Sequence, residues 1–174
     1  MDVVNKPFHG YKAFNKGLTN VFGKEFKVGE KYAVNDKHKG YGYHFCEYLE
    51  DVFVYYTGED KQICEVIGSG NTIIYNNDYY GVYDVYSSTE LYIVREISRE
   101  EIIKYFLDMS SVASFRIINF IIRFKMTKDE IDLFLTRFAN NKIIIDAINY
   151  YQLGMIDLYN NKKLVKLKKN QIID

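Results

Sequence analysis

The pattern of apolar residues changes near residue 104, and this change constrains the fold more than any other feature. Residues 1–104 contain short runs rich in Tyr, Val, Ile and Phe, separated by turn-forming residues, which is typical of strands. Residues 105–174 repeat apolar side chains with the 3.6-residue period of amphipathic helices. The sequence therefore predicts an α+β protein, with a mixed or antiparallel sheet in the domain 1–104 and a helical subdomain at 105–174.

Short strands account for most of the first part. We expect them at residues 11–14, 41–45, 62–67, 72–75, 82–86 and 90–95, with one helix at residues 47–56. Gly68-Ser-Gly70 and Asn76-Asn77-Asp78 consist of turn-forming residues. Each is therefore expected to separate two strands, the second as the tip of a hairpin.

Two capping boxes mark the starts of helices toward the C-terminus. Ser98 with Glu101, and Thr127 with Glu130, have the spacing at which the hydroxyl accepts from a backbone amide and the carboxylate reaches back. Gly154 stands where a left-handed cap would end the last helix. The helices are expected to begin at residue 98 and to span 112–124, 128–139 and 142–152, with inward stripes formed by Ile102, Ile103, Phe106, Leu107, Ile131, Phe134, Leu135 and Phe138.

Charge and cysteine usage exclude several classes of protein. The chain has 23 basic and 23 acidic side chains, so no overall field attracts nucleic acid or anionic membranes. This balance combines 12 basic and 16 acidic residues in 1–104 with 11 basic and 7 acidic residues in 105–174. Cys46 and Cys64 lack metal-ligand spacing, so we expect reduced, buried thiols and no metal site. No leader or membrane span is visible, which predicts a cytoplasmic protein.

Two features offer a partner-binding surface. The basic run near the C-terminus consists of Lys162, Lys163, Lys166, Lys168 and Lys169. It could contact an acidic surface or be a solvated face, and it lacks the Arg and aromatic pattern of base readers, which disfavours direct nucleic-acid binding. The 17 tyrosines could form a docking surface or line the edge of a core.

Five sequence blocks follow one another between residues 10 and 104. They are Gly10-Tyr-Lys-Ala-Phe14, Phe26-Lys-Val-Gly-Glu-Lys-Tyr32, Gly42-Tyr-His-Phe-Cys-Glu47, Asp51-Val-Phe-Val-Tyr-Tyr56 and Glu96-Ile-Ser98. In this order they resemble a family of uncharacterised proteins from phages, prophages and other bacterial mobile elements. The resemblance implies a mobile-element protein but no activity. Together with the small size, the tyrosines and the split of charge between the two parts, it favours a protein that binds and inhibits a host protein or ribonucleoprotein, such as a bacterial defence component, without a cofactor.

Three segments carry a second resemblance. Gly42-Tyr-His-Phe-Cys-Glu47, Glu65-Val-Ile-Gly-Ser-Gly70 and Glu90-Leu-Tyr-Ile-Val94 are similar to strand motifs of poly(ADP-ribose) polymerase-like ADP-ribosyltransferases. This resemblance implies a related fold. It also gives the alternative function, an NAD-dependent transferase that modifies a host protein or nucleic acid.

The transferase resemblance assigns roles to individual residues. It implies that Lys12 and His44 occupy the positions of a motif histidine and a motif tyrosine, and that Tyr55 stacks on nicotinamide. It makes Glu90 the catalytic carboxylate, which would stabilise an oxocarbenium-like centre as nicotinamide leaves. From the residues alone, His44 could orient a ligand or be a satisfied histidine at the end of a sheet.

Overall fold

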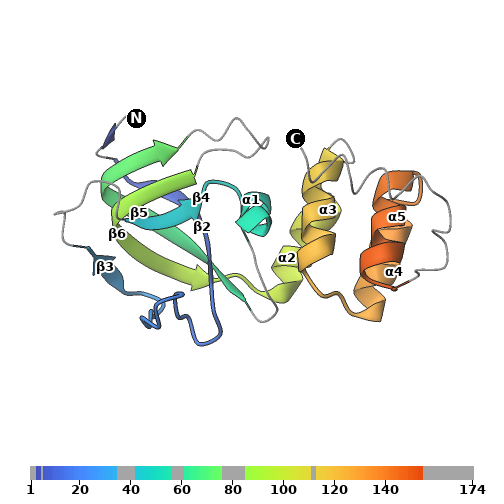
Figure 1. The fold of residues 1–174 in the computed structure, drawn as a ribbon, viewed down its shortest axis with the longest axis horizontal. Coiled ribbons are helices and arrows are strands. Elements are labelled where there is room, and N and C mark those ends of the chain that lie inside the picture. The colour runs from blue at the N-terminus through green and yellow to red at the C-terminus, as the bar shows by residue number, and fades with distance from the viewer. Residues whose placement is uncertain are drawn as a thin grey trace.

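The computed structural model describes residues 3–4, 6–34, 42–55, 61–75, 85–110 and 113–154, and the chain folds as an α+β protein (Figure 1). The strands are Val3–Val4 (β1), Phe8–Phe14 (β2), Lys31–Ala33 (β3), Tyr43–Cys46 (β4), Gln62–Tyr75 (β5) and Val85–Glu96 (β6). The helices are Leu49–Tyr55 (α1), Arg99–Asp108 (α2), Ser114–Arg123 (α3), Lys128–Arg137 (α4) and Lys142–Tyr151 (α5). These described helices have seven or ten residues and are too short to cross a bilayer.

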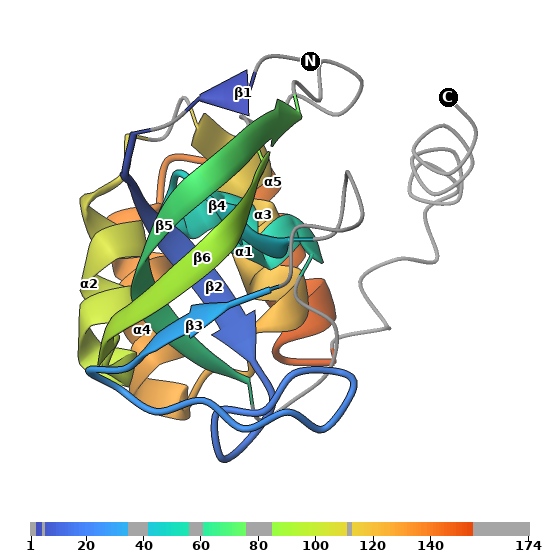
Figure 2. The same ribbon diagram turned by 90° about the vertical axis from the view of Figure 1, so that its left-hand side faces the viewer.

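The strands β5, β2, β4 and β6 form a small closed barrel. Each strand pairs antiparallel with the next, and the ring closes because β5 also pairs with β6. Strand β1 adds to β5, and β3 adds to β6. Figure 2 shows the long, bent β5 and β6 crossing in front of the helices. The sheet is therefore antiparallel, the second of the two arrangements that the sequence left open.

One face of each barrel strand points inward and forms an aromatic core, here called the inner core. Its members are Phe14, Phe26, Tyr43, Phe45, Cys64, Val66, Tyr86, Leu91 and Ile93. Alternate residues along each strand face the opposite side, as the two-residue period of a strand requires. Ile63 and Cys46, for example, belong to a different cluster on the outside of the barrel.

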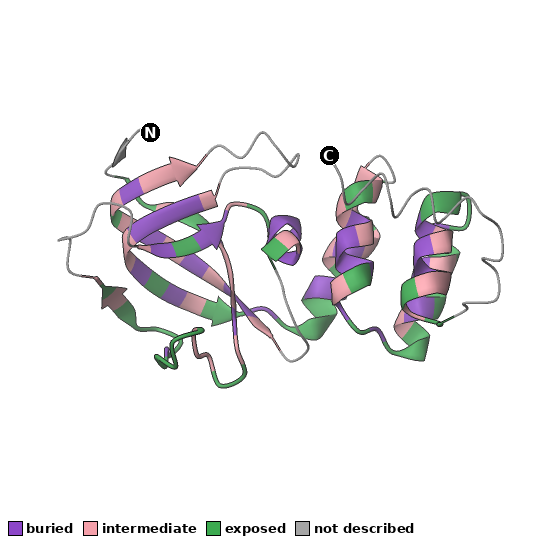
Figure 3. Cartoon of the chain, in the orientation of Figure 1, coloured by how far each residue is buried: buried purple, intermediate pink, exposed green. Residues whose placement is uncertain are grey.

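That second cluster, the outer core, joins the barrel to the helices. Helix α1 lies between the barrel and α3, and α2–α5 form a layer beyond it (Figures 1 and 3). The cluster contains Phe53 from α1 together with residues of every later helix. Phe106 and Phe120 stack at its centre with ring centroids 4.1 Å apart. The boundary expected after residue 104 falls inside α2, and the outer core contains residues from both parts of the sequence.

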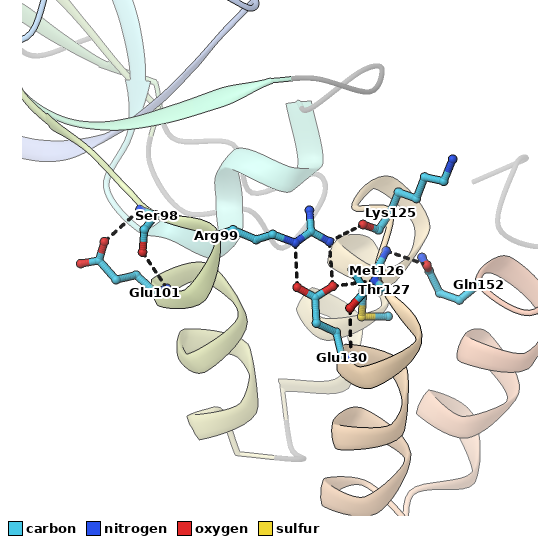
Figure 4. Close-up of polar contacts among 8 residues, drawn as sticks. All are labelled: Ser98, Arg99, Glu101, Lys125, Met126, Thr127, Glu130 and Gln152. Atoms are coloured by element: carbon cyan, nitrogen blue, oxygen red, sulfur yellow. Dashed lines mark hydrogen bonds and ion pairs between the residues drawn. The ribbon is translucent and has the colours of Figure 1, made fainter.

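Both expected capping boxes are present, and one arginine connects them. The Ser98 and Thr127 hydroxyls accept from the backbone amides of Glu101 and Glu130, whose carboxylates accept from the cap amides in return (Figure 4). Arg99 Nε donates to Glu130 Oε1 over 2.7 Å, and Arg99 also donates to the Lys125 carbonyl over 2.6 Å. The starts of α2 and α4 are therefore held together.

The strand predictions were wrong at two places. Residues 62–67 and 72–75 belong to one continuous strand, β5, because the segment around Ser69 forms a register shift rather than a turn. Gly70, with φ of +74°, supplies the left-handed residue that such an irregularity requires. The separate strands expected at 82–86 and 90–95 are likewise joined as β6, described from Val85. Strand β3 was not expected, and residues 76–78 lie outside the described residues.

Candidate functional site

A cavity of about 330 Å³ opens beside the line where β2 and β4 meet, here called the seam. Three elements supply most of its wall: β2, β4 and α1. The lining residues are Tyr11, Lys12, Ala13, His44, Phe45, Cys46, Val52, Tyr55 and Val85. This volume lies at the small end of the range of roughly 300–1,000 Å³ for ligand pockets, so the cavity suits a small ligand.

The local sequence explains why the seam opens. Among the described residues, β2 and β4 share a single register pair, Tyr11 opposite Cys46. Gly10 permits this contact, because a Cβ at its position would lie 2.3 Å from the Cys46 carbonyl oxygen. Beyond this pair the two strands are not paired with each other, and the gap between them becomes part of the cavity.

Lys12 lies in this gap. Its neighbours Tyr11 and Ala13 pack against the outer core, so strand alternation directs Lys12 to the other side of β2. The Lys12 ammonium donates to the His44 carbonyl oxygen over 2.5 Å and lies 5.7 Å from the centroid of the Phe14 ring. Burial in this apolar setting lowers the pKa of Lys12 to about 8.

Burial also shifts the pKa values of two other polar groups that line the cavity, His44 and Cys46. Burial lowers the pKa of His44, and the nearby Lys12 ammonium lowers it further. Burial raises the pKa of the Cys46 thiol to about 12, and Asp51 adds to this shift. A thiol with such a pKa is protonated and is a poor nucleophile. The Tyr55 side chain, 48 % exposed, also lines the cavity.

Glu90 does not line this cavity. It lies on β6, opposite Ala33 of β3 and Ser69 of β5. Its carboxylate forms a 2.7 Å ion pair with Lys31 and accepts a 2.7 Å hydrogen bond from the Ser69 hydroxyl. The contact with Lys31 lowers the pKa of Glu90 most, and the hydrogen bond from Ser69 lowers it further. Of the four residues that the transferase resemblance selects, the fold brings together Lys12, His44 and Tyr55.

Sequence reasoning missed two groups of residues. Tyr11, Cys46 and Val52 line the cavity, and only the pairing of β2 with β4 shows that they share a site. The second group is the pair Val21 and Phe22, here called the apolar tip, with side chains 80 % and 90 % exposed. The sequence signal for the tip was present, because Asn20 and a glycine flank the pair as turn residues do.

The apolar tip is held on an ordered turn. The Asn20 side-chain oxygen accepts from the backbone amides of Phe22 and Lys24, over 3.0 and 2.9 Å. Gly23 adopts φ of +79°, which suits glycine, and its amide donates to the Asn20 carbonyl. Phe26, at the base of the loop, is buried in the inner core. The backbone therefore fixes two large apolar side chains in solvent.

The remaining sequence candidates fall elsewhere. The five lysines between positions 162 and 169 lie outside the described residues. Cys46 and Cys64 are free and buried, as expected. Within the described part of the chain, no group of three His, Cys, Asp or Glu side chains could hold a metal ion.

Comparison with protein families shows which family this chain resembles. Residues 8–105 match the family model of a domain of unknown function, DUF7666. The chain belongs to this family. The DUF7666 domain covers more than half of the sequence, from β2 into α2, and so includes the barrel, α1 and the whole cavity. Comparison with curated proteins and with solved structures gives no match.

Proposed function

We propose that this protein acts by binding: a phage or mobile-element protein that occludes a host macromolecule, such as a bacterial defence component. The observation that carries the proposal is the apolar tip. Val21 and Phe22 are the most exposed large apolar side chains in the described part of the chain, and they are adjacent. An aromatic side chain presented on an ordered turn loses little conformational freedom on binding, which makes it an effective anchor for a partner pocket.

The apolar tip is suited to contacting a partner and is not needed to hold the fold together. Its backbone hydrogen bonds hold the turn without help from either apolar side chain. Replacing the two side chains should therefore leave the fold intact while removing the anchor. Substitutions at exposed positions of this kind usually change the free energy of unfolding by less than about 0.5 kcal/mol.

The test compares two double variants in a capture experiment. Wild-type protein, Val21→Ser with Phe22→Ser, and a control with Phe115→Ser and Ile143→Ser are each used to capture partners from a bacterial host lysate. The control residues are 54 % and 64 % exposed and lie on the helices α3 and α5. The proposal expects a prey protein that the control retains and the tip variant loses, with affinity reduced at least about tenfold. Equal capture by all three proteins would reject the tip as the contact.

A second candidate function is binding of NAD, with transferase chemistry as its fullest form. The convergence of Lys12, His44 and Tyr55 on one cavity favours it. The position of Glu90 weighs against group transfer, because the chemistry needs a carboxylate beside the ribose, and no carboxylate among the described residues lines the cavity. The second candidate function is therefore binding of the nicotinamide end of NAD in this cavity, without group transfer.

Calorimetric titration of NAD tests the second candidate. Tyr55→Ala should weaken binding through the lost ring contact, worth about 0.5–1.5 kcal/mol beyond buried area, whereas Tyr151→Ala, on the exposed surface of α5, should not. Glu90→Gln should leave binding unchanged. A mass increase corresponding to ADP-ribose on a partner, lost in Glu90→Gln, would restore the transferase hypothesis instead.

A further inference from the structure

Lys12 is the one cationic side chain among the described residues that line the cavity, and it faces no carboxylate there. The contact of its ammonium is with a neutral group, the His44 carbonyl. The titratable groups around it are His44 and Cys46 on β4, Tyr11 on β2 and Tyr55 on α1. Burial keeps the Cys46 thiol protonated, with a pKa of about 12, and raises the pKa of Tyr11.

A cation that faces no anion among the described residues of an apolar cavity is costly there, because burial disfavours the charged form. The lowered pKa of Lys12, about 8, expresses that cost. An anion bound beside the ammonium would restore the missing counter-charge in a setting of low dielectric, where such a hydrogen-bonded ion pair is strong. The cavity is thus built to favour an anionic ligand over a neutral one of the same shape.

The rest of the wall limits the ligand further. Ala13, Phe45, Val52 and Val85 present apolar surface, and Tyr55 presents a ring at the rim. A volume of about 330 Å³ leaves room for a single ring with a small substituent. One ammonium can match one carboxylate, whereas a phosphate dianion would need further cationic donors that the described lining does not supply.

We propose that the cavity binds a single-ring aromatic carboxylate, with its carboxylate on the Lys12 ammonium and its ring between the apolar wall and Tyr55. This site is independent of the apolar tip. It also differs from a nicotinamide site, because it selects a ligand by negative charge rather than by a neutral carboxamide.

Proton linkage gives the site a distinctive pH profile. Only the protonated form of Lys12 pairs with the carboxylate, so affinity should be level below pH 7 and fall by up to about tenfold per pH unit above pH 8. Because the pKa of His44 is lowered from 6.5, its titration does not contribute to the decline above pH 8, which is left to Lys12.

The test titrates benzoate, and its neutral analogue benzamide, into the full-length protein and follows amide chemical shifts. Benzoate should bind at least about tenfold more tightly than benzamide at pH 7, and Lys12→Met should abolish this preference. Lys12→Arg should keep the preference, and because arginine stays protonated it should remove the decline above pH 8. The control Lys16→Met removes an exposed charge just beyond the same strand.

Three outcomes would overturn the proposal. They are benzamide binding as tightly as benzoate, benzoate binding unchanged in Lys12→Met, and no shifts up to roughly 10 mM benzoate. Thermal unfolding of each variant accompanies the titration, and the charge-preserving Lys12→Arg keeps the test valid if Lys12→Met does not fold. Because the tip variant retains the cavity, failure of either proposal leaves the other standing.

Discussion

The helical layer α2–α5 and the barrel differ in how their elements are joined. Three of the four helices of the layer begin with a side-chain cap, and an arginine joins two of those caps. In the barrel, by contrast, β2 and β4 share one register pair among the described residues, and a lysine fills part of the gap. The helices are thus joined to one another at their caps, whereas the barrel has a cavity beside its shortest strand pairing.

Removing a central ring from the outer core should have the largest effect. Phe120 is fully buried and stacks on Phe106 and Phe124. Phe120→Ala should lower the free energy of unfolding by about 4 kcal/mol, because it leaves a cavity that cannot collapse. Urea denaturation measures the change. Phe115→Ala, on the exposed side of the same helix, should change it by less than about 0.5 kcal/mol; equal losses would contradict the packing described.

Breaking the ionic link between α1 and α3 should have the next largest effect on the free energy of unfolding. Arg116 forms a 2.9 Å ion pair with the buried Glu50, and its Nε lies 3.7 Å from Asp51. Arg116→Met would leave two carboxylates buried in the outer core without that counter-charge, and should cost about 3 kcal/mol. The matched change Arg95→Met, at exposed ion pairs with Glu65 and Glu101, should have a much smaller effect, because solvent screens exposed charges. Chemical denaturation of both variants decides whether this link is more than a surface contact.

Inside the barrel, adding a single methyl group should lower the free energy of unfolding. A Cβ at Gly68 would lie 2.4 Å from Phe45 ring atoms and from the Ser88 hydroxyl. Gly68→Ala should therefore cost about 2 kcal/mol through overpacking. Adding Phe45→Leu should recover part of this loss, which a double-mutant cycle measures as a favourable coupling. Strict additivity of the two changes would show that the contact is not the cause.

The smallest effect should appear on acidification of the helical layer. Hydrogen bonding to Arg99, aided by the Thr127 amide, lowers the pKa of Glu130 in the folded protein below its unfolded value of about 4.3. The resulting stabilisation is complete above that unfolded pKa and is lost as pH falls through the folded pKa. Glu130→Gln should cost about 1 kcal/mol at pH 7, and the gap in Tm should narrow as the pH falls through the folded pKa of Glu130. Asp146→Asn, at an exposed helix pair, should show a smaller gap.

Local signals in the sequence predicted the helical layer well. Both capping boxes, the inward positions of Ile102, Ile103 and Phe106, and Gly154 with its positive φ follow from residues within one or two turns of each other. The strands were less predictable because Gly68 and Gly70 resemble a turn in sequence but occupy a close contact and a strand irregularity in the structure. That distinction depends on a partner strand, which no local window contains.

The candidate site was predictable only through resemblance. His44 and Tyr55 belong to blocks that the sequence offered as similar to known motifs, and Lys12 was assigned by position. Their meeting at one cavity depends on the pairing of β2 with β4 across 31 intervening residues, from position 12 to position 44. The placement of Glu90 depends in the same way on β3, a strand that sequence periodicity did not predict.

The order of strand pairing also bears on how the barrel forms and opens. β5 and β6 pair along most of their length and are joined by a short connection, so this sequence-local hairpin carries a small loop-closure cost and should form early in folding. Pairing of β2 with β4 closes the ring through one register pair. Opening the β2–β4 pair should therefore need the least free energy. Amide hydrogens beside the seam should exchange through small local openings, while those of the β5–β6 hairpin stay protected. A ligand of the cavity would then enter through such small local openings of the native state.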